Sequence, residues 1–145
     1  MAVDVLTEIL IERPPDEVAR FAADPTNAPR WYVNIRAVEW KTAPPLAVGS
    51  RLAFVAHFLG RRLAYTYQVV DHVPHERLVM RTAEGPFPME TTYTFSAAPG
   101  GTRMTLRNRG QPAGFSRLVA PLMAAAMRRA NRKDLRRLKQ LLEAP

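Results

Sequence analysis

The sequence predicts an α+β fold in which a long C-terminal helix covers the apolar face of a seven-stranded antiparallel sheet, with two short helices after the first strand. Three observations support this prediction. Apolar and polar residues alternate over several short segments, turns rich in proline and glycine separate these segments, and an amphipathic stretch occupies residues 115–143. An antiparallel sheet with one apolar face needs a cover, and the C-terminal stretch is the predicted element large enough to provide it.

The first strand and the two short helices are predicted from the N-terminal forty residues. Residues 3–12 alternate as in a strand with one buried face. Pro15, followed by two acids, opens a helix, because proline fits the first turn and acids favour its positive end. A second short helix or turn is expected over residues 27–32, and a strand over residues 35–40.

A first hairpin is predicted to join strands over residues 51–59 and 62–71 through a two-residue Gly60-Arg61 turn. This turn pairs Leu59 with Arg62. A four-residue loop would keep the same parity, so the assignment of faces does not depend on the loop length. The predicted apolar and aromatic face carries Leu52, Phe54, Ala56, Phe58, Leu63, Tyr65, Tyr67 and Val69.

A second hairpin is predicted to join strands over residues 89–97 and 102–109, after a further strand over residues 77–82. Pairing Ala97 with Thr102 sets threonines and an opposite-charge pair on the outer face, as expected for a solvated surface. The inner pairs are then Phe95 with Met104, Tyr93 with Leu106, and Thr91 with Asn108.

The predicted C-terminal helix has an apolar face and a basic face. Pro121 is expected either to kink this helix or to mark its true first turn. The half that contains Leu135 and Leu142 is expected to seal one end of the fold. The apolar positions follow steps of three and four with one step of five: Phe115, Leu118, Leu122, Ala126, Ala130, Leu135, Leu138 and Leu142.

The basic face accounts for most of the formal net charge of +8, because residues 110–145 hold eight Lys and Arg against two acids. The simplest interpretation is the solvated side of a covering helix. The alternatives are binding of an acidic protein, such as an acyl carrier protein, or of an anionic membrane. Nucleic-acid binding is disfavoured, because no aromatic residues interleave with the cations for base stacking.

The composition narrows the remaining possibilities. We expect one domain over residues 1–145, with no thiolate or disulfide chemistry because cysteine is absent. The three histidines match no familiar zinc spacing, so neither a metal nor a cofactor is predicted. The N-terminus lacks the features of a signal peptide, and no apolar run reaches transmembrane length, which predicts a cytoplasmic protein. As a separate expectation, the protein is a monomer or a homodimer.

The motifs, taken in order, resemble the START-like (SRPBCC, helix-grip) superfamily and its polyketide cyclase/dehydrase-like branch. The matching pieces are Ile9-x-Ile11-x-x-Pro14-Pro15-x-Glu17-Val18, Asp24-Pro25-x-x-x-x-Arg30-Trp31, Val48-Gly49-x-Arg51, Pro74-x-x-x-Leu78, Tyr93-Thr94-Phe95, Gly101-Thr102-Arg103-x-Thr105 and Asp134-Leu135-x-x-Leu138-Lys139. The resemblance implies that a curved sheet wraps around the helix without closing fully against it. The gap between them is an apolar cavity for a hydrophobic ligand. It does not imply one activity, because cyclases and lipid binders share this fold.

The resemblance and the predicted faces together give a set of candidate ligand-binding residues. The segment Gly85-Pro86-Phe87-Pro88-Met89 is a candidate rim loop, and Trp31 is placed near the mouth. The sheet is expected to contribute Phe54, Phe58, Tyr65, Tyr67, Met80, Tyr93, Met104 and Asn108, and the helix Leu118, Leu122 and Met123.

Three functions follow as hypotheses. The preferred one is binding of a small hydrophobic ligand (a polyketide, lipid or aromatic compound) with no chemistry assigned. The second is an aromatic polyketide cyclase/dehydratase that uses the inward tyrosines and Asn108, with Arg36 or Arg81 as further polar groups. No inward acid or histidine is evident, so no catalytic residue is assigned. For each tyrosine a purely structural hydrogen bond is the favoured interpretation, whereas for Asn108 a structural and a ligand-binding role are equally open. The third hypothesis is an interaction module that binds an acidic partner through the basic helix.

Overall fold

The computed structural model describes residues 3–58, 60–85, 87–111 and 120–145, and the elements follow the predicted order. Pro15 and its two acids lie in the first turn of the first helix, as the sequence predicts. The elements are β1 (Val3–Ile11), α1 (Pro15–Ala22), the 3-10 turn η1 (Pro25–Asn27), α2 (Ala28–Trp31), β2 (Ile35–Trp40), β3 (Arg51–Phe58), β4 (Arg61–Val73), β5 (Arg77–Glu84), β6 (Met89–Ala98), β7 (Gly101–Gly110) and α3 (Ala120–Glu143).

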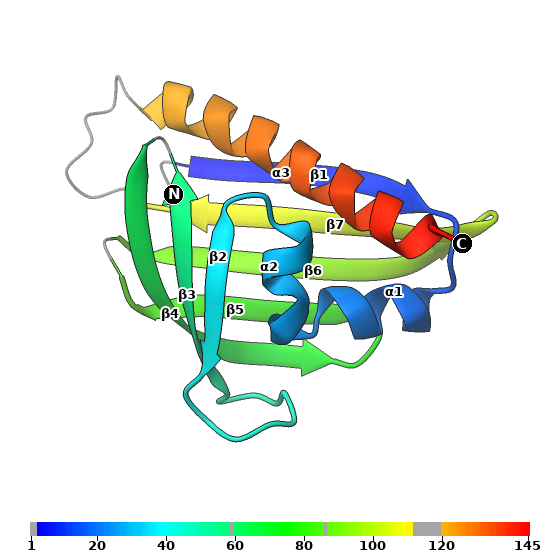
Figure 1. The fold of residues 1–145 in the computed structure, drawn as a ribbon, viewed down its shortest axis with the longest axis horizontal. Coiled ribbons are helices and arrows are strands. Elements are labelled where there is room, and N and C mark those ends of the chain that lie inside the picture. Colours follow the sequence, from blue (N-terminus) through cyan, green and yellow to red (C-terminus); the bar gives the residue numbers. More distant parts are fainter. Residues whose placement is uncertain (1–2, 59, 86, 112–119) are drawn as a thin grey trace.

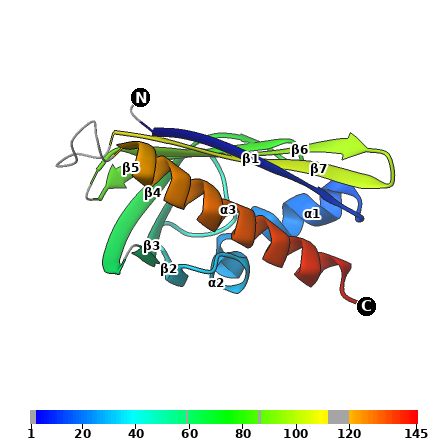
Figure 2. The same ribbon diagram turned by 90° about the horizontal axis from the view of Figure 1, so that it is seen from above.

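The seven strands form one antiparallel sheet in the order β1-β7-β6-β5-β4-β3-β2. The sheet curls strongly, so that β2 and β3 run across the direction of β1 and β7 (Figure 1). All three α-helices lie on one side of β1, β6 and β7, which is the concave side (Figure 2). The predicted α+β arrangement, a curved sheet around a C-terminal helix, is therefore confirmed.

The register of the β6–β7 hairpin is the predicted one, with Ala97 opposite Thr102 and Thr91 opposite Asn108. The register predicted for the β3–β4 hairpin is wrong by two residues. Phe58 pairs with Arg61, so Phe54 faces Tyr65. Gly60 has a φ of +75°, which glycine adopts more easily than arginine, and this favours a reversal one residue earlier than predicted. A shift of two keeps the parity, so the predicted faces are correct.

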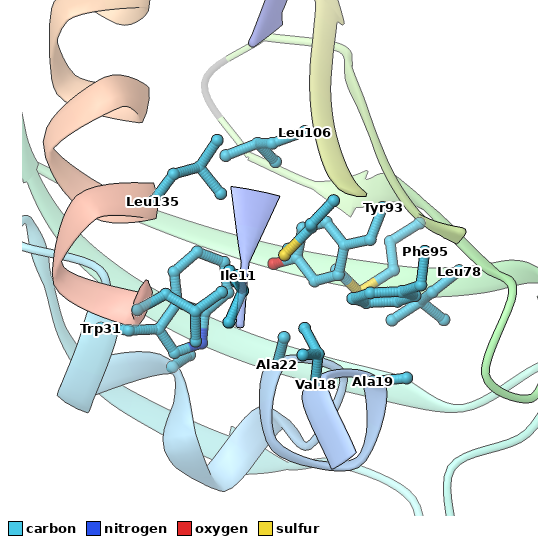
Figure 3. Packing of buried hydrophobic residues seen from close by; sticks show 14 of the residues in the cluster. Ile11, Val18, Ala19, Ala22, Trp31, Leu78, Tyr93, Phe95, Leu106 and Leu135 are labelled. Atoms are coloured by element: carbon cyan, nitrogen blue, oxygen red, sulfur yellow. The ribbon is translucent and has the colours of Figure 1, made fainter. Parts of the chain in front are cut away.

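The main core lies where α1, α2 and the C-terminal half of α3 meet the concave face. Trp31, Ile11 and Leu135 gather there and are almost completely buried (Figure 3). The ring of Trp31 lies 4.0 Å from that of Tyr32 and 5.7 Å from that of Tyr93, measured between centroids. The C-terminal half of α3 therefore seals this end of the fold, as the sequence predicts.

Helix α3 is attached to β1 at its C-terminal end. The Glu143 carboxylate accepts the Glu12 backbone N–H at 2.8 Å, and Lys139 Nζ donates to the Leu10 carbonyl at 2.8 Å. At the other end, Met123 packs with Val3 and Val5 in a separate small cluster. Pro121 lies in the first described turn of α3, whereas Phe115 and Leu118 lie outside the described residues. Among the described residues, no helix combines the length and hydropathy needed to span a bilayer.

Candidate functional site

A cavity of about 150 Å³ separates the concave face of the sheet from α3. It is lined by Tyr32, Asn34, Ile35, Phe54, Ala56, Phe58, Leu63, Tyr65, Tyr67, Met80, Phe87, Met89, Thr91, Tyr93, Asn108, Met123, Met127, Ala130, Asn131 and Asp134. Eight of the predicted ligand-binding residues are therefore at the cavity: Phe54, Phe58, Tyr65, Tyr67, Met80, Tyr93, Asn108 and Met123. That they contact a ligand stays a prediction.

Three of the predicted lining residues lie elsewhere. Trp31 is completely buried in the core behind the cavity, because α2 inserts its ring between the sheet and α3. Met104 is also completely buried in that core and does not reach the cavity. Leu122 points to solvent and is 71 % exposed. Successive helix residues are turned by about 100°, so the inward position of Met123 directs Leu122 away. Leu118 lies outside the described residues.

The rings from the sheet form an aromatic wall on one side of the cavity. The centroid of the Tyr65 ring lies 5.9 Å from that of Tyr67 and 6.1 Å from that of Phe87, and Phe54 lies 5.7 Å from Tyr67. These separations are typical of edge-to-face and offset ring pairs. Gly85 permits the position of Tyr65, because a Cβ atom at Gly85 would lie 2.7 Å from Tyr65 Cδ1. The predicted rim segment thus supplies Phe87 and Met89 to the lining, whereas Pro86 lies outside the described residues.

The tyrosine hydroxyls are donors and not bases. Tyr32 and Tyr93 share a hydrogen bond of 2.5 Å between their hydroxyl oxygens. Burial raises the pKa of Tyr93 and of Tyr65 far above the ordinary value, and the pKa of Tyr32 rises for the same reason. These phenols therefore keep their protons at any physiological pH. On the neighbouring strands, Thr91 Oγ1 donates to Asn108 Oδ1 at 2.8 Å, so the side-chain carbonyl of Asn108 has a structural partner.

An inward acid, which the sequence analysis did not find, lies on α3. Asp134 is 2 % exposed and its Oδ1 accepts the Val33 backbone N–H at 2.8 Å. Burial raises the pKa of Asp134 to about 7, against the opposing effects of the Val33 N–H and the Arg137 charge. The expectation that no acid faces inward is therefore wrong. The spacing of residues along α3 could have indicated that Asp134 faces inward. Asp134 lies four residues before the buried Leu138 and shares one helix face with Met127 and Asn131.

The other polar candidates do not reach the cavity. Arg36 is exposed, and Arg81 pairs with Glu90 at 2.7 Å. His57 is exposed, whereas His72 and His75 lie at the opposite end of the sheet. Among the residues that the structure describes, no cluster of His, Asp and Glu side chains is arranged to hold a metal ion.

A second cleft of about 360 Å³ lies between α1, the segment after β2 and the β4–β5 turn. Prolines and turn residues line much of it, and its arginines already have partners: Arg77 pairs with Asp71 at 2.6 Å and Arg20 with Asp16 at 3.3 Å. The first cavity combines apolar walls with several converging buried polar groups, as is usual for ligand sites. We therefore take it as the candidate site.

Comparisons with known proteins agree with this geometry. Residues 2–143 match a protein-family model described as "Polyketide cyclase / dehydrase and lipid transport". No curated protein sequence matches the chain. Among solved structures, it is similar to TTHA0849 from Thermus thermophilus, with 22% identity, 97% of each chain covered and a TM-score of 0.85.

Two further structures have names that point to function. The Zhui aromatase/cyclase from a Streptomyces species, R1128, shows 17% identity and a TM-score of 0.79, with 97% of this chain and 93% of that chain covered. A START superfamily protein from Mycobacterium smegmatis shows 14% identity and a TM-score of 0.76, with 95% and 98% covered. At these identities the likeness shows the helix-grip fold alone.

Proposed function

Because the chain belongs to the polyketide cyclase/dehydrase and lipid transport family, we propose that it binds a small hydrophobic ligand in the cavity between the sheet and α3. The ligand class includes polyketides, lipids and aromatic compounds. The observation that carries the proposal is the cavity itself, which lies between the sheet and α3 and is lined by aromatic and apolar side chains together with buried polar groups. A volume of about 150 Å³ is of the size that holds one benzene ring in an apolar interior.

The lining favours a ring-shaped ligand. Rings on the sheet side offer flat contact surfaces, and the methionines on α3 adapt to irregular shapes. The polar groups that line the cavity come from different elements, so they can orient a ligand once it is bound. A cytoplasmic location and the oligomeric state, monomer or homodimer, stay predictions.

Filling the cavity tests the proposal. Ala130 lines the cavity, whereas Ala125 lies on the exposed face of the same helix. In calorimetric titrations with a panel of aromatic compounds, Ala130→Leu is expected to abolish binding and Ala125→Leu to leave it unchanged. Native mass spectrometry of the purified protein offers an independent search for a co-purified ligand. Absence of binding by the wild type across the panel would refute the proposal.

Asp134 favours a second candidate function, catalysis of the cyclase/dehydratase type. With a pKa of about 7, a carboxyl group can both remove and return protons near neutral pH. We propose that it would act on a bound poly-β-keto chain, with one hydroxyl of the hydrogen-bonded Tyr32–Tyr93 pair donating to a substrate oxygen while it accepts from the other. Asp134→Asn should then abolish turnover of a poly-β-keto substrate while binding persists. Unchanged turnover in this variant, or in the Phe variants of Tyr65, Tyr67 and Tyr93, would remove those residues from the reaction.

A further inference from the structure

Three buried side-chain nitrogens have no hydrogen-bond partner within residues 3–58, 60–85, 87–111 and 120–145: Trp31 Nε1, Arg109 Nε and Asn131 Nδ2. Trp31 belongs to the packed core, and Arg109 pairs with Glu90 through its Nη1 atom at 3.6 Å. Of the three, only Asn131 lines the cavity. The side chain of Asn131 is 5 % exposed, so solvent at the protein surface does not satisfy the amide.

A buried amide without a partner destabilises a folded protein, and native structures contain few such groups. Leucine has the same number and branching of side-chain heavy atoms as asparagine and would occupy this position of α3 without that penalty. The position of the amide at the cavity indicates that its partner is a group that enters the cavity.

Asp134 lies one helical turn after Asn131 on the same face of α3. Its Oδ1 accepts the Val33 N–H, and within the described part of the chain this is the only hydrogen bond of the carboxyl group. Since burial raises the pKa of Asp134 to about 7, much of the group is protonated near neutral pH and can donate through its O–H. The helix side of the cavity thus presents two neighbouring donors.

The lining also indicates the charge of the ligand. No Lys, Arg or His is among the described residues that line the cavity. A carboxylate or phosphate would therefore be buried without a cation, which is strongly unfavourable. This argues against fatty acids and phospholipid headgroups at this position, and in favour of an uncharged acceptor.

We propose that Asn131 and Asp134 form an oxygen-binding subsite that selects ring compounds carrying an uncharged carbonyl group. The carbonyl oxygen accepts from Asn131 Nδ2–H and from the Asp134 O–H, while the ring packs against the aromatic wall of the sheet. This inference rests on the proposed function, since it names the class of ligand that the same cavity binds.

Acetophenone and ethylbenzene test the subsite, because they share one carbon skeleton and differ by the carbonyl oxygen. Calorimetry or ligand-observed NMR on the full chain gives the ratio of their affinities. Asn131→Leu is expected to reduce the preference for acetophenone by about threefold to tenfold, which is the effect of one neutral hydrogen bond. Gln140→Leu removes an exposed amide from the same helix, outside the cavity lining, and serves as the control that should leave the ratio unchanged.

The pH dependence of the preference for acetophenone over ethylbenzene tests the contribution of the Asp134 carboxyl group. The charged and titratable groups that act on it are Arg137 on α3, Tyr32 before β2 and Tyr93 on β6, and the raised pKa values of the two tyrosines keep them protonated between pH 6 and pH 8. In the wild type the preference for acetophenone should fall by up to about tenfold over this range, as the carboxyl group loses its proton. Asp134→Asn keeps an N–H donor and should show no such fall.

The possible outcomes distinguish a failure of the carbonyl subsite from a failure of the proposed ligand-binding function. Binding of both compounds with a ratio that Asn131→Leu leaves unchanged would overturn the subsite and leave the proposed function standing. Tighter binding of 1-phenylethylamine than of acetophenone would overturn it as well, because the subsite would then recognise a cation. Binding of neither compound by the wild type would overturn the subsite, and the proposed function would then be decided separately by the wider panel of compounds. The melting temperature of ligand-free Asn131→Leu is a separate readout: we expect it at or above that of the wild type, and a fall of several degrees would show that the amide has a partner inside the protein.

Discussion

Replacing Asp134 by asparagine is expected to change how the stability of the protein depends on pH. In the folded protein the pKa of Asp134 is about 7, whereas the ordinary value for the unfolded chain is 3.8. The folded state therefore holds the proton more tightly, and stability falls as pH rises from about 4 to about 7. At 1.36 kcal/mol per pH unit, the full loss is about 4 kcal/mol.

Asparagine has the same shape as the protonated acid but does not ionise. Its side-chain oxygen can still accept the Val33 N–H, so the attachment of α3 to the start of β2 is retained. Asp134→Asn should therefore be more stable than the wild type at neutral pH. We expect the difference in unfolding free energy to widen by about 2–3 kcal/mol between pH 5 and pH 8.

Urea denaturation of both proteins at pH 5, 6, 7 and 8 measures this difference. Asp4 and Glu143 have lowered pKa values and titrate below this range in both proteins, so they cancel in the comparison. Asp134→Ala is the control: it loses the Val33 bond at every pH and should differ from Asp134→Asn by a constant amount. A difference between Asp134→Asn and wild type that does not change with pH would refute the burial of an ionisable acid at the cavity.

Three further perturbations have defined outcomes. Tyr93→Phe leaves the buried Tyr32 hydroxyl without its partner, and urea denaturation should show a loss of about 1–3 kcal/mol. The double variant with Tyr32→Phe should lose less than the sum of the two single changes. Gly85→Ala brings a Cβ to 2.7 Å from Tyr65 Cδ1, so the ring must move, and NMR chemical shifts of Tyr65 together with weaker binding of aromatic probes would report this. Reversing the charges of Arg129, Lys133 and Arg137, which are exposed and have no ion pair among the described residues, should abolish binding of any acidic partner; pull-down signals that survive the reversal would dismiss the interaction-module hypothesis.

Alternation of apolar and polar residues made most of the fold predictable, because a sheet with one buried face imposes a period of two on every strand. The β6–β7 register was predicted correctly, since Gly100 and Gly101 mark the reversal clearly. The β3–β4 register was not, because both faces keep their character when the pairing shifts by two residues. Alternation alone does not distinguish such registers.

The polar residues of the site were harder to predict for a physical reason. Hydropathy assigns Asn131 and Asp134 to the solvent side of a basic helix, yet both are buried because α3 faces a cavity and not a fully packed core at this point. The spacing of the apolar positions predicted for the C-terminal helix already indicated that Asn131 and Asp134 were assigned to the wrong face. Its five-residue step from Ala130 to Leu135 passes over the two inward polar residues, and the same error in phase placed Leu122 inside.

The attachments of α3 are unevenly distributed along its length. The C-terminal end is held to β1 through Glu143 and Lys139, and the middle to Val33 through Asp134, while the N-terminal half contacts the sheet through the small cluster around Met123. Local opening of the helix should therefore begin at its N-terminal half, beside the cavity. In hydrogen–deuterium exchange, backbone amides near Met127 are expected to exchange faster than those near Leu138, and a ligand in the cavity should slow the fast end alone. The same helix then combines a fixed end that maintains the fold with an end beside the cavity that opens more readily.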